Sequence, residues 1–225
     1  MKNKISNHAE EYLEAIYRLE KEKGSAKTME LVKKLKVVPG SITNTIENLE
    51  KRGFVIHQPY LGVKLTKKGR DIATDVLKRH RLAERLLTDF LKLDWSQVHD
   101  AACKLEHAIP PEVIEPLENA LGNPTTCPHG NLIHLNKVDS IDEKTKSLSV
   151  LDPGDEGIIV RITSEESNIL ERLGKLDILP TSHVKVTNDN RSVDFLEILV
   201  NGKSRKLDPE LAVHVQVKPL SRGGN

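Results

Sequence analysis

The hydrophobic periodicity of this chain changes once along its length, and the change limits the folds it can adopt. Up to about residue 121, apolar residues recur three and four positions apart, as Tyr12, Ile16 and Leu19 do within His8–Lys23. This spacing is typical of one face of an α-helix. From residue 147 onward, short β-branched runs separated by turn residues predict strands; these runs are SLSVL, GIIVRI, HVKVT, FLEILV and HVQVKPL. The pattern predicts an α+β chain with more than one domain.

The first part of the chain carries the signals of a winged helix-turn-helix. After the helix at His8–Lys23, a second is expected over Thr28–Leu35 and a third from its cap at Ser41 to Arg52, with the Pro-Gly turn of VVPG between them. The runs FVIH and VKLT then flank QPYLG, which indicates a β-hairpin with Gly62 at its turn. Short helices joined by a tight turn and followed by a hairpin predict this DNA-binding motif.

Three further helices are expected between the hairpin and the strands. The first begins after a cap at Thr66 and runs from Lys67 to about Leu93. It is longer than the first domain requires, so its far end could be buried in a dimer interface. Helices over Trp95–Ala108 and about Glu112–Leu121 follow, and GNPTTCPHGN then forms a Pro- and Gly-rich connector.

The strand-rich end, interrupted by one helical stretch at Glu165–Leu176, predicts a small SH3-like β-barrel. We therefore expect three domains, over residues 1–73, 74–140 and 147–221.

Composition and the lengths of the apolar runs indicate the cellular compartment of the protein. Hydrophobic residues make up 37% of the chain, which is enough for compact cores. Apolar runs fall short of the ~20 residues of a membrane-spanning helix, and the N-terminus lacks the apolar core of a signal peptide. We expect a cytoplasmic protein without a membrane partner. The chain has only two cysteines, Cys103 and Cys127, so a disulfide framework is not expected and Cys103 is available as a thiolate ligand.

Charge is divided unevenly along the chain. The net charge is +1 overall, but residues 1–75 hold 15 Lys and Arg against 10 Asp and Glu, and residues 27–70 hold 10 against 3. A basic first module favours nucleic acid as its partner. A solvated charged surface would give the same counts.

The stretch HDAACKLEH holds four side chains that commonly bind metals. His99, Cys103, Glu106 and His107 lie at positions i, i+4, i+7 and i+8, which would share one face of a helix. Thiolate, imidazole and carboxylate together suit Fe(II), Co(II), Ni(II) or Zn(II). They fit Mg²⁺ and Ca²⁺ badly, because those ions prefer all-oxygen shells. The alternative is a helix with a polar face.

A second pair, His80 and Glu84, lies at i, i+4 on the preceding helix. Such a pair is also common as a surface ion pair. Cys127 and His129 of CPHG lie on a proline-bound loop, and we interpret them as structural.

KRHRLAERLL at Lys78–Leu87 and VHDAACKLEH at Val98–His107 resemble the diphtheria toxin repressor and iron-dependent regulator family. The resemblance covers nearly the whole chain, since the two ligand-bearing helices follow a winged helix and precede an SH3-like (FeoA-like) domain. It implies a homodimeric, metal-activated transcriptional repressor, not an enzyme, which binds a palindromic operator in double-stranded DNA and controls metal uptake or homeostasis genes.

The resemblance also implies two metal sites. The primary, activating site corresponds to Glu11, Cys103, Glu106 and His107. The ancillary site corresponds to His80, Glu84 and His99, with Glu166 from the SH3-like domain nearest by alignment and Glu165 and Asn168 close to it.

The physiological metal stays open between two ions. Iron-responsive members with a Cys at position 103 often have Met at position 11, whereas manganese-responsive members have carboxylates at both. This chain combines Cys103 with Glu11. We favour Fe(II), with Mn(II) second, and expect Co(II), Ni(II) or Zn(II) to substitute in vitro.

The recognition helix is expected at Ser41–Arg52, where short polar side chains at its start would meet base edges. The residues expected to contact DNA are Val38, Gly40, Ser41, Thr43 and Asn44, together with Lys27, Lys64, Lys67 and Lys68 as phosphate partners. Tyr60 at the wing tip could touch the backbone or pack the hairpin.

Three rival functions remain at this stage. A metalloenzyme would need an open coordination position and a general base beside a substrate pocket. A metal-independent winged-helix regulator would bind DNA equally well in chelator. A metal buffer or carrier would bind metal but no specific DNA.

Overall fold

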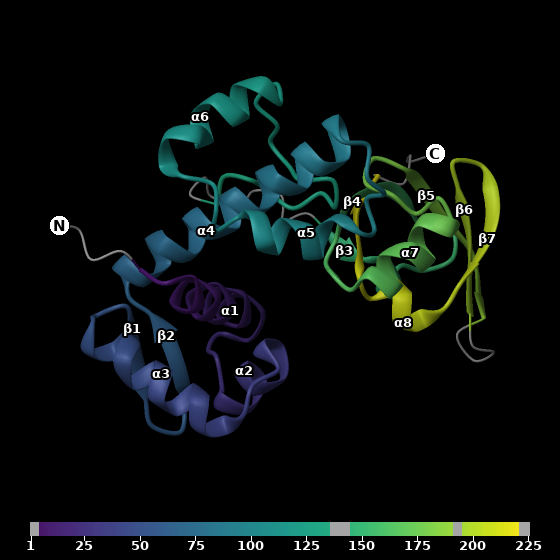
Figure 1. Ribbon diagram of the computed structural model, residues 1–225. Helices are drawn as coiled ribbons and strands as arrows, with labels where there is room; N and C mark the ends of the chain where they lie inside the picture. Colours follow the sequence, from purple (N-terminus) through teal and green to yellow (C-terminus); the bar gives the residue numbers. More distant parts are fainter. Residues whose placement is uncertain (1–4, 136–144, 191–194, 221–225) are drawn as a thin grey trace. The chain divides into compact units, whose positions relative to one another are not determined.

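The computed structural model describes residues 5–135, 145–190 and 195–220 (Figure 1). The chain divides into two compact units. The first is Met1–His80 with Glu106–Ile109, and the second is Arg81–Leu105 with Pro110–Asn225. The division into three domains stays a prediction, and its limits at residues 1, 140 and 221 lie outside the described residues.

The first unit is a winged helix-turn-helix, as predicted. Its buried side chains form one core, to which Leu13, Ile16, Leu31, Ile42 and Val63 contribute. Its elements are α1 (Asn7–Lys23), α2 (Thr28–Leu35), α3 (Pro39–Lys51), β1 (Val55–Gln58), β2 (Gly62–Leu65) and the first part of α4 (Lys67–Arg85).

Local signals explain most of these bounds. The Ser6 hydroxyl accepts a hydrogen bond from the Ala9 amide at 3.3 Å and caps α1. The Thr66 hydroxyl accepts one from the Gly69 amide at 3.1 Å, so the predicted cap of α4 is confirmed. The prediction that Ser41 caps α3 is wrong. Val38 is the cap and Pro39 the first helical residue, a position that suits proline because its missing N–H needs no partner there.

The predicted hairpin is present with each strand shifted by one residue, and Gly62 is the first residue of β2, directly after the turn. β1 and β2 pair antiparallel, with Gln58 opposite Gly62. Gly62 has φ 102°, and a Cβ there would lie 2.7 Å from the carbonyl oxygen of Ala26. Both the backbone angle and the close approach require glycine at this turn.

Two of the three helices predicted after the hairpin are shorter than expected, and the third is shifted by one residue. α4 ends at Arg85 and continues as a π-helical turn over Leu86–Phe90. α5 spans Val98–Leu105 rather than Trp95–Ala108. At its end, Glu106 to Ala108 form a turn, consistent with the two prolines from residue 110, which disfavour helical geometry just before them. α6 spans Pro111–Ala120.

The strand-rich part contains a six-stranded sheet of order β3-β8-β4-β5-β6-β7. Among the described residues this order has two ends, so the predicted SH3-like sheet is present but does not close into the predicted barrel. The strands are β3 (Lys146–Ser147), β4 (Glu156–Ile162), β5 (His183–Asn190), β6 (Phe195–Val200), β7 (Lys203–Leu207) and β8 (Val215–Pro219).

Two helices accompany this sheet, α7 (Ser167–Lys175) and α8 (Pro209–Ala212). Leu170 and Leu173 of α7 are fully buried in the core formed by the inner face of the sheet. The SLSVL run was wrongly predicted as a strand, because after Ser147 it forms a 3-10 turn at Leu148–Val150.

The connector after α6 is folded against β4. Thr126 pairs with Leu132 across a tight turn, and the Ile162 amide donates to the His129 carbonyl oxygen at 2.8 Å. Gly130 has φ 85°, and a Cβ there would overlap the carbonyl oxygen of Val160. In the described part of the chain, no helix is long and apolar enough to cross a membrane.

Candidate metal centre and DNA-binding surface

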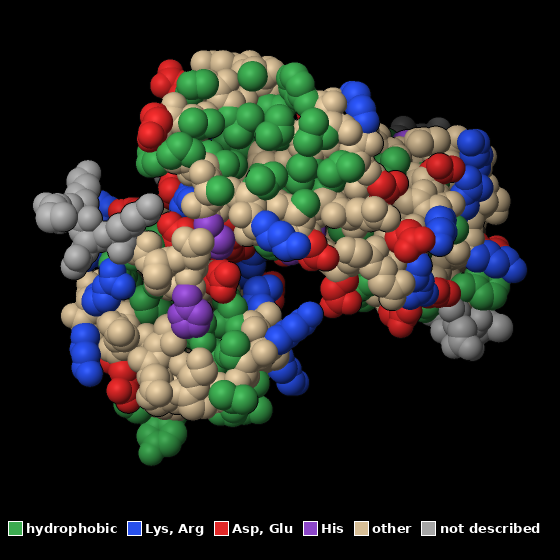
Figure 2. Space-filling view, in the orientation of Figure 1, with side chains coloured by type: hydrophobic (Ala, Val, Ile, Leu, Met, Phe, Trp, Pro, Cys, Tyr) green, Lys and Arg blue, Asp and Glu red, His purple; other side chains and the backbone are tan. Residues whose placement is uncertain are grey.

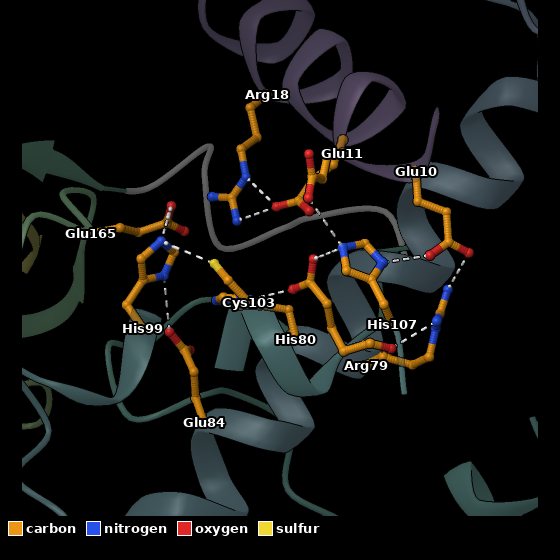
Figure 3. A network of polar contacts seen from close by, with 12 residues as sticks. Glu10, Glu11, Arg18, Arg79, His80, Glu84, His99, Cys103, His107 and Glu165 are labelled. Carbon is orange, nitrogen blue, oxygen red and sulfur yellow. Dashed lines mark hydrogen bonds and ion pairs between the residues drawn. The ribbon is translucent and has the colours of Figure 1, made fainter. Parts of the chain in front are cut away.

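His107 is oriented by a carboxylate on α1. Its Nδ1 lies 2.6 Å from Glu10 Oε2, and Arg79 donates to the other Glu10 oxygen at 3.0 Å (Figure 3). Arg79 also donates to the carbonyl oxygen of Glu106 at 2.7 Å. Because a carboxylate only accepts hydrogen bonds, Nδ1 carries a proton, and Nε2 is the nitrogen that can bind a metal ion.

Nε2 of His107 faces two further carboxylates. It lies 3.2 Å from Glu106 Oε1 and 3.9 Å from Glu11 Oε1. One imidazole nitrogen and two carboxylates therefore converge, and together they can bind a cation. The donor set of one imidazole nitrogen and two carboxylate oxygens fits Mn(II) and Fe(II). The Glu10–His107 pair is the type of outer hydrogen bond that fixes a metal-binding imidazole.

Glu106 is buried between two histidines. Its Oε2 lies 2.6 Å from His80 Nδ1, and both side chains are almost inaccessible to solvent. Burial raises the pKa of Glu106, while the hydrogen bond to His80 and the charges of His80 and His107 act in the opposite direction. Its carboxylate thus sits where a positive charge would stabilise the ionised form.

A second group of ligand side chains lies within the second unit. His99 Nδ1 is 3.7 Å from Glu84 Oε1, and His99 Nε2 is 3.7 Å from Glu165 Oε2. The Cys103 sulfur lies 3.6 Å from the same Nε2 (Figure 3). α4, α5 and the segment before α7 thus supply a carboxylate, an imidazole, a thiol and a second carboxylate.

The exposed start of α3 carries the residues expected to meet DNA. Val38, Gly40, Thr43 and Asn44 are exposed, whereas Ser41 is half-buried, with its hydroxyl 3.5 Å from the Tyr12 hydroxyl.

The four predicted lysines are all exposed and lie at the start of α2, on β2 and at the start of α4. Lys68 is also used within the fold, because its ammonium lies 4.4 Å from the centre of the Phe54 ring and donates to the Arg52 carbonyl oxygen at 3.3 Å. Tyr60, at the tip of the wing, is fully exposed.

Three family models match the chain. Residues 4–63 match the iron dependent repressor N-terminal DNA binding domain, and residues 66–135 match the iron dependent repressor metal binding and dimerisation domain. Residues 146–219 match the FeoA domain. The iron-dependent repressor IdeR of Mycobacterium leprae is 31% identical over 97% of this chain and 100% of its own length. The chain belongs to the iron-dependent repressor family. The diphtheria toxin repressor of Corynebacterium glutamicum is 32% identical over 94% of this chain and 96% of its own.

Solved structures of metal-dependent repressors share this fold. A manganese-dependent transcriptional repressor in complex with manganese aligns with a TM-score of 0.85 at 25% identity, covering 94% of this chain and 100% of that chain. IdeR of Thermoplasma acidophilum aligns with a TM-score of 0.75 at 26% identity, covering 96% and 99%. The predictions of an iron- or manganese-dependent repressor and of a chain that is not an enzyme are therefore confirmed.

This repressor family binds DNA and dimerises, as the sequence predicted. Figure 2 shows hydrophobic side chains gathered on one face over α6. The exposed large hydrophobic residues of the dimerisation part are Phe90, Leu91, Leu93, Leu105 and Val113.

The repressor brings part of each predicted ligand set together. Glu11, Glu106 and His107 of the primary set converge in the first unit, together with His80 of the ancillary set. Glu84, His99 and Cys103 lie in the second unit. Glu165 is the side chain that approaches His99, whereas Glu166 is the cap residue of α7.

Sequence reasoning missed the role of Glu10 and the proximity of Glu84 to Cys127 and His129. For Glu10 the signal was the Glu-Glu pair in α1, of which only the second member was selected. For Cys127 and His129 the signal was their Cys-x-His spacing in CPHG, but nothing in the sequence indicates that Glu84 lies beside them.

Proposed function

We propose that this repressor binds a palindromic operator as a homodimer when Glu11, Cys103, Glu106 and His107 hold Fe(II), with Mn(II) as the second candidate. A bound ion would supply positive charge and coordination bonds that join these side chains. The controlled genes would serve metal uptake or homeostasis. His80, Glu84, His99 and Glu165 or Glu166 form the proposed ancillary set.

One observation carries the proposal. Glu10 holds Nδ1 of His107, so that the other ring nitrogen, Nε2, faces Glu106 and Glu11. Both Glu10 and Glu11 come from α1, which contacts α2 and β2 of the DNA-binding motif and whose Tyr12 hydroxyl lies 3.5 Å from the Ser41 hydroxyl of α3. The orienting residue and one ligand therefore belong to the element that supports the recognition helix.

The segment Glu106–Ile109 belongs to the DNA-binding unit, although α5 before it and α6 after it belong to the other unit. Ligation of Glu106 and His107 to Glu11 would fix this segment against α1 and restrict the dimer to geometries in which two recognition helices fit one operator. Moving such an equilibrium from 1:99 to 99:1 requires about 5.5 kcal/mol of preference for the active state.

At the DNA, the side chains at the start of α3 offer few bidentate base contacts. Thr43 and Asn44 can each read a base edge, while the lysines supply phosphate contacts that do not depend on sequence. We expect operator shape to contribute strongly to specificity.

Anaerobic fluorescence anisotropy with DNA from the gene's own upstream region tests the proposal. The protein is titrated in chelator, in Fe(II) and in Mn(II), and binding should tighten only with metal. His107→Ala should abolish the metal response and His80→Ala should weaken it. His134→Ala is the matched control, because His134 is half-exposed and paired with Glu118 at 2.9 Å in the second unit.

Each alternative gives a different result. Equal binding in chelator and metal would favour a metal-independent regulator. Metal binding without specific DNA binding would favour a buffer or carrier. A metal response that survives His107→Ala would refute the primary-site assignment.

A further inference from the structure

Glu14 and Arg18 lie on the face of α1 that is turned toward the proposed primary site. Glu11, Glu14 and Arg18 follow one another at positions i, i+3 and i+7, which share one face of a helix. Figure 3 shows Glu11 and Arg18 both reaching from α1 toward the side where His107 lies. All four residues belong to the first unit. The pair therefore borders the proposed site, although neither member is a predicted ligand.

The two side chains form a partly buried ion pair. Arg18 Nε donates to Glu14 Oε1 at 2.8 Å, and Arg18 Nη2 lies 2.7 Å from the same oxygen. The side chains are only 16% and 13% exposed. Charges that are partly withdrawn from solvent are screened much less than charges on the surface. Both members can therefore act on an ion that is bound nearby.

The charge of Glu14 already acts on one proposed ligand. Burial is the main cause that raises the pKa of Glu106, and the negative charge of Glu14 raises it further. A nearby like charge disfavours the ionised form of a carboxyl group. Glu14 is therefore a third carboxylate in the neighbourhood of the site, after Glu11 and Glu106.

A third carboxylate exceeds what a divalent ion requires. Glu11 and Glu106 together carry two negative charges, which balance the charge of the ion. Glu14 would add a surplus negative charge if no cation accompanied it. The guanidinium of Arg18 supplies the compensating positive charge, because arginine does not lose its proton in proteins.

α1 brings three carboxylates to this region, Glu10, Glu11 and Glu14. Arg79 lies 3.0 Å from Glu10, and Arg18 lies 2.7 Å from Glu14. The two carboxylates that are not proposed as ligands are thus each paired with an arginine, whereas Glu11 faces the imidazole. This pattern indicates that the arginines, as well as the ligands, set the charge of the site.

Charge balance matters to a sensor in particular. A surplus negative charge strengthens the attraction for any cation. A site that binds its ion too tightly stays occupied when metal becomes scarce, and the repressor would then not release its operator. A positive charge that offsets the surplus therefore keeps metal binding reversible.

We propose that Arg18 is a positioning residue that acts through Glu14, neutralising this carboxylate beside the primary site and thereby lowering the affinity of that site for a divalent ion. The proposal rests on the proposed function, because it takes Glu11, Glu106 and His107 as ligands. The alternative is an ion pair that only stabilises α1, since Glu and Arg four residues apart support a helix.

Competition for Mn(II) between the full chain and a metallochromic chelator at low ionic strength tests the proposal. A unit charge about 10 Å from a divalent ion changes its affinity about fourfold even at the dielectric constant of water. Arg18→Gln should therefore raise the affinity for Mn(II) at least about fourfold. Glu14→Gln should lower it by a similar factor, because the charge of Glu14 is lost while that of Arg18 remains. The double variant should return close to the affinity of the unaltered chain.

The opposite signs separate the proposal from the alternative. Loss of an ion pair that only stabilises α1 would lower the affinity in both variants or leave both unchanged. Arg18→Lys keeps the positive charge and should stay within about twofold of the unaltered chain. Lys175→Gln is the matched control, because it removes a positive charge from another i, i+4 pair, with Glu171 at 2.7 Å, on α7. This control should leave the affinity unchanged.

His107→Ala in the same assay distinguishes this proposal from the proposed function. If His107→Ala lowers the affinity but Arg18→Gln does not raise it, Arg18 does not tune the site, and the proposed function stands. If His107→Ala binds Mn(II) as tightly as the unaltered chain, the primary site is wrongly assigned and both proposals fall. The midpoint of Mn(II)-activated DNA binding should move to a lower Mn(II) concentration in Arg18→Gln.

Discussion

Glu10→Gln should weaken metal binding at the primary site although Glu10 is not proposed as a ligand. The change keeps an oxygen that can accept from His107 Nδ1 but removes the negative charge 2.6 Å from that nitrogen. It also removes one of the two carboxylates paired with Arg79, because Glu10 lies 3.0 Å and Asp75 3.2 Å from its guanidinium, so more positive charge remains near the bound ion. Both effects should lower the affinity of the proposed primary site for a cation.

The geometry sets the size of this effect. The Glu10 side chain is only 15% exposed, so solvent screens its charge incompletely. Loss of an outer partner of a metal-binding histidine typically reduces affinity 10–100-fold, which corresponds to about 1.4–2.7 kcal/mol. Glu11→Gln, which alters a proposed ligand, should cost more.

The assay is competition for Mn(II) between the repressor and a metallochromic chelator, with the midpoint of metal-activated DNA binding as second readout. Glu22→Gln is the matched control, because it makes the same charge change at an exposed position of the same helix. If Glu10→Gln and Glu22→Gln agree within about twofold, far below the 10–100-fold loss expected, Glu10 does not orient His107 and the reasoning fails.

Three further predictions concern the DNA-binding unit. Gly69→Ala should destabilise it by about 1–3 kcal/mol, because the added Cβ overlaps the carbonyl oxygen of Phe54. Gly40→Ala should instead stabilise it by up to about 1 kcal/mol, because Gly40 lies in a helix and a Cβ there would meet open space. Chemical denaturation followed by circular dichroism gives both values, and equal effects would contradict the steric argument. Thr66→Ala should cost about 1 kcal/mol by the same measurement, since the Gly69 amide loses its cap, and no loss would mean that water replaces the hydroxyl. Lys67→Ala should weaken binding to all DNA sequences alike and reduce the salt slope by about 1; a sequence-dependent loss would instead indicate base contact.

Local signals were sufficient for the winged helix. The spacing of Tyr12, Ile16 and Leu19 gave α1 to within one residue at its start, and Thr66 marked the start of α4 correctly. These features depend on residues close in sequence, so pattern and capping rules apply directly. β7 was missed because its run KSRKL is mostly polar and lies at the edge of the sheet, where charged side chains, especially lysines, discourage pairing with another chain.

The ligand geometry could not be predicted in the same way. The i, i+7, i+8 argument placed Glu106 and His107 on one helical face with His99, but α5 ends at Leu105. Both residues lie in the following turn and make their contacts with His80 and α1 instead. The choice of ligands did not depend on this face, because it rested on residue type and family resemblance and it stays a prediction. The shared face rested on a helix that the prolines shorten.

The helical geometry of α1 explains why the adjacent residues Glu10 and Glu11 have different roles. On a helix, neighbouring side chains point about 100° apart, so Glu10 and Glu11 cannot meet the same atom of a partner held on one side. They reach opposite nitrogens of one imidazole instead, at 2.6 Å from Nδ1 and 3.9 Å from Nε2. The shorter contact is a charge-assisted hydrogen bond that exists without metal. The longer one is too long for a hydrogen bond and leaves room for an ion. Part of the proposed centre is therefore assembled without metal, and we expect Glu11 to be the side chain that gains most from a bound ion.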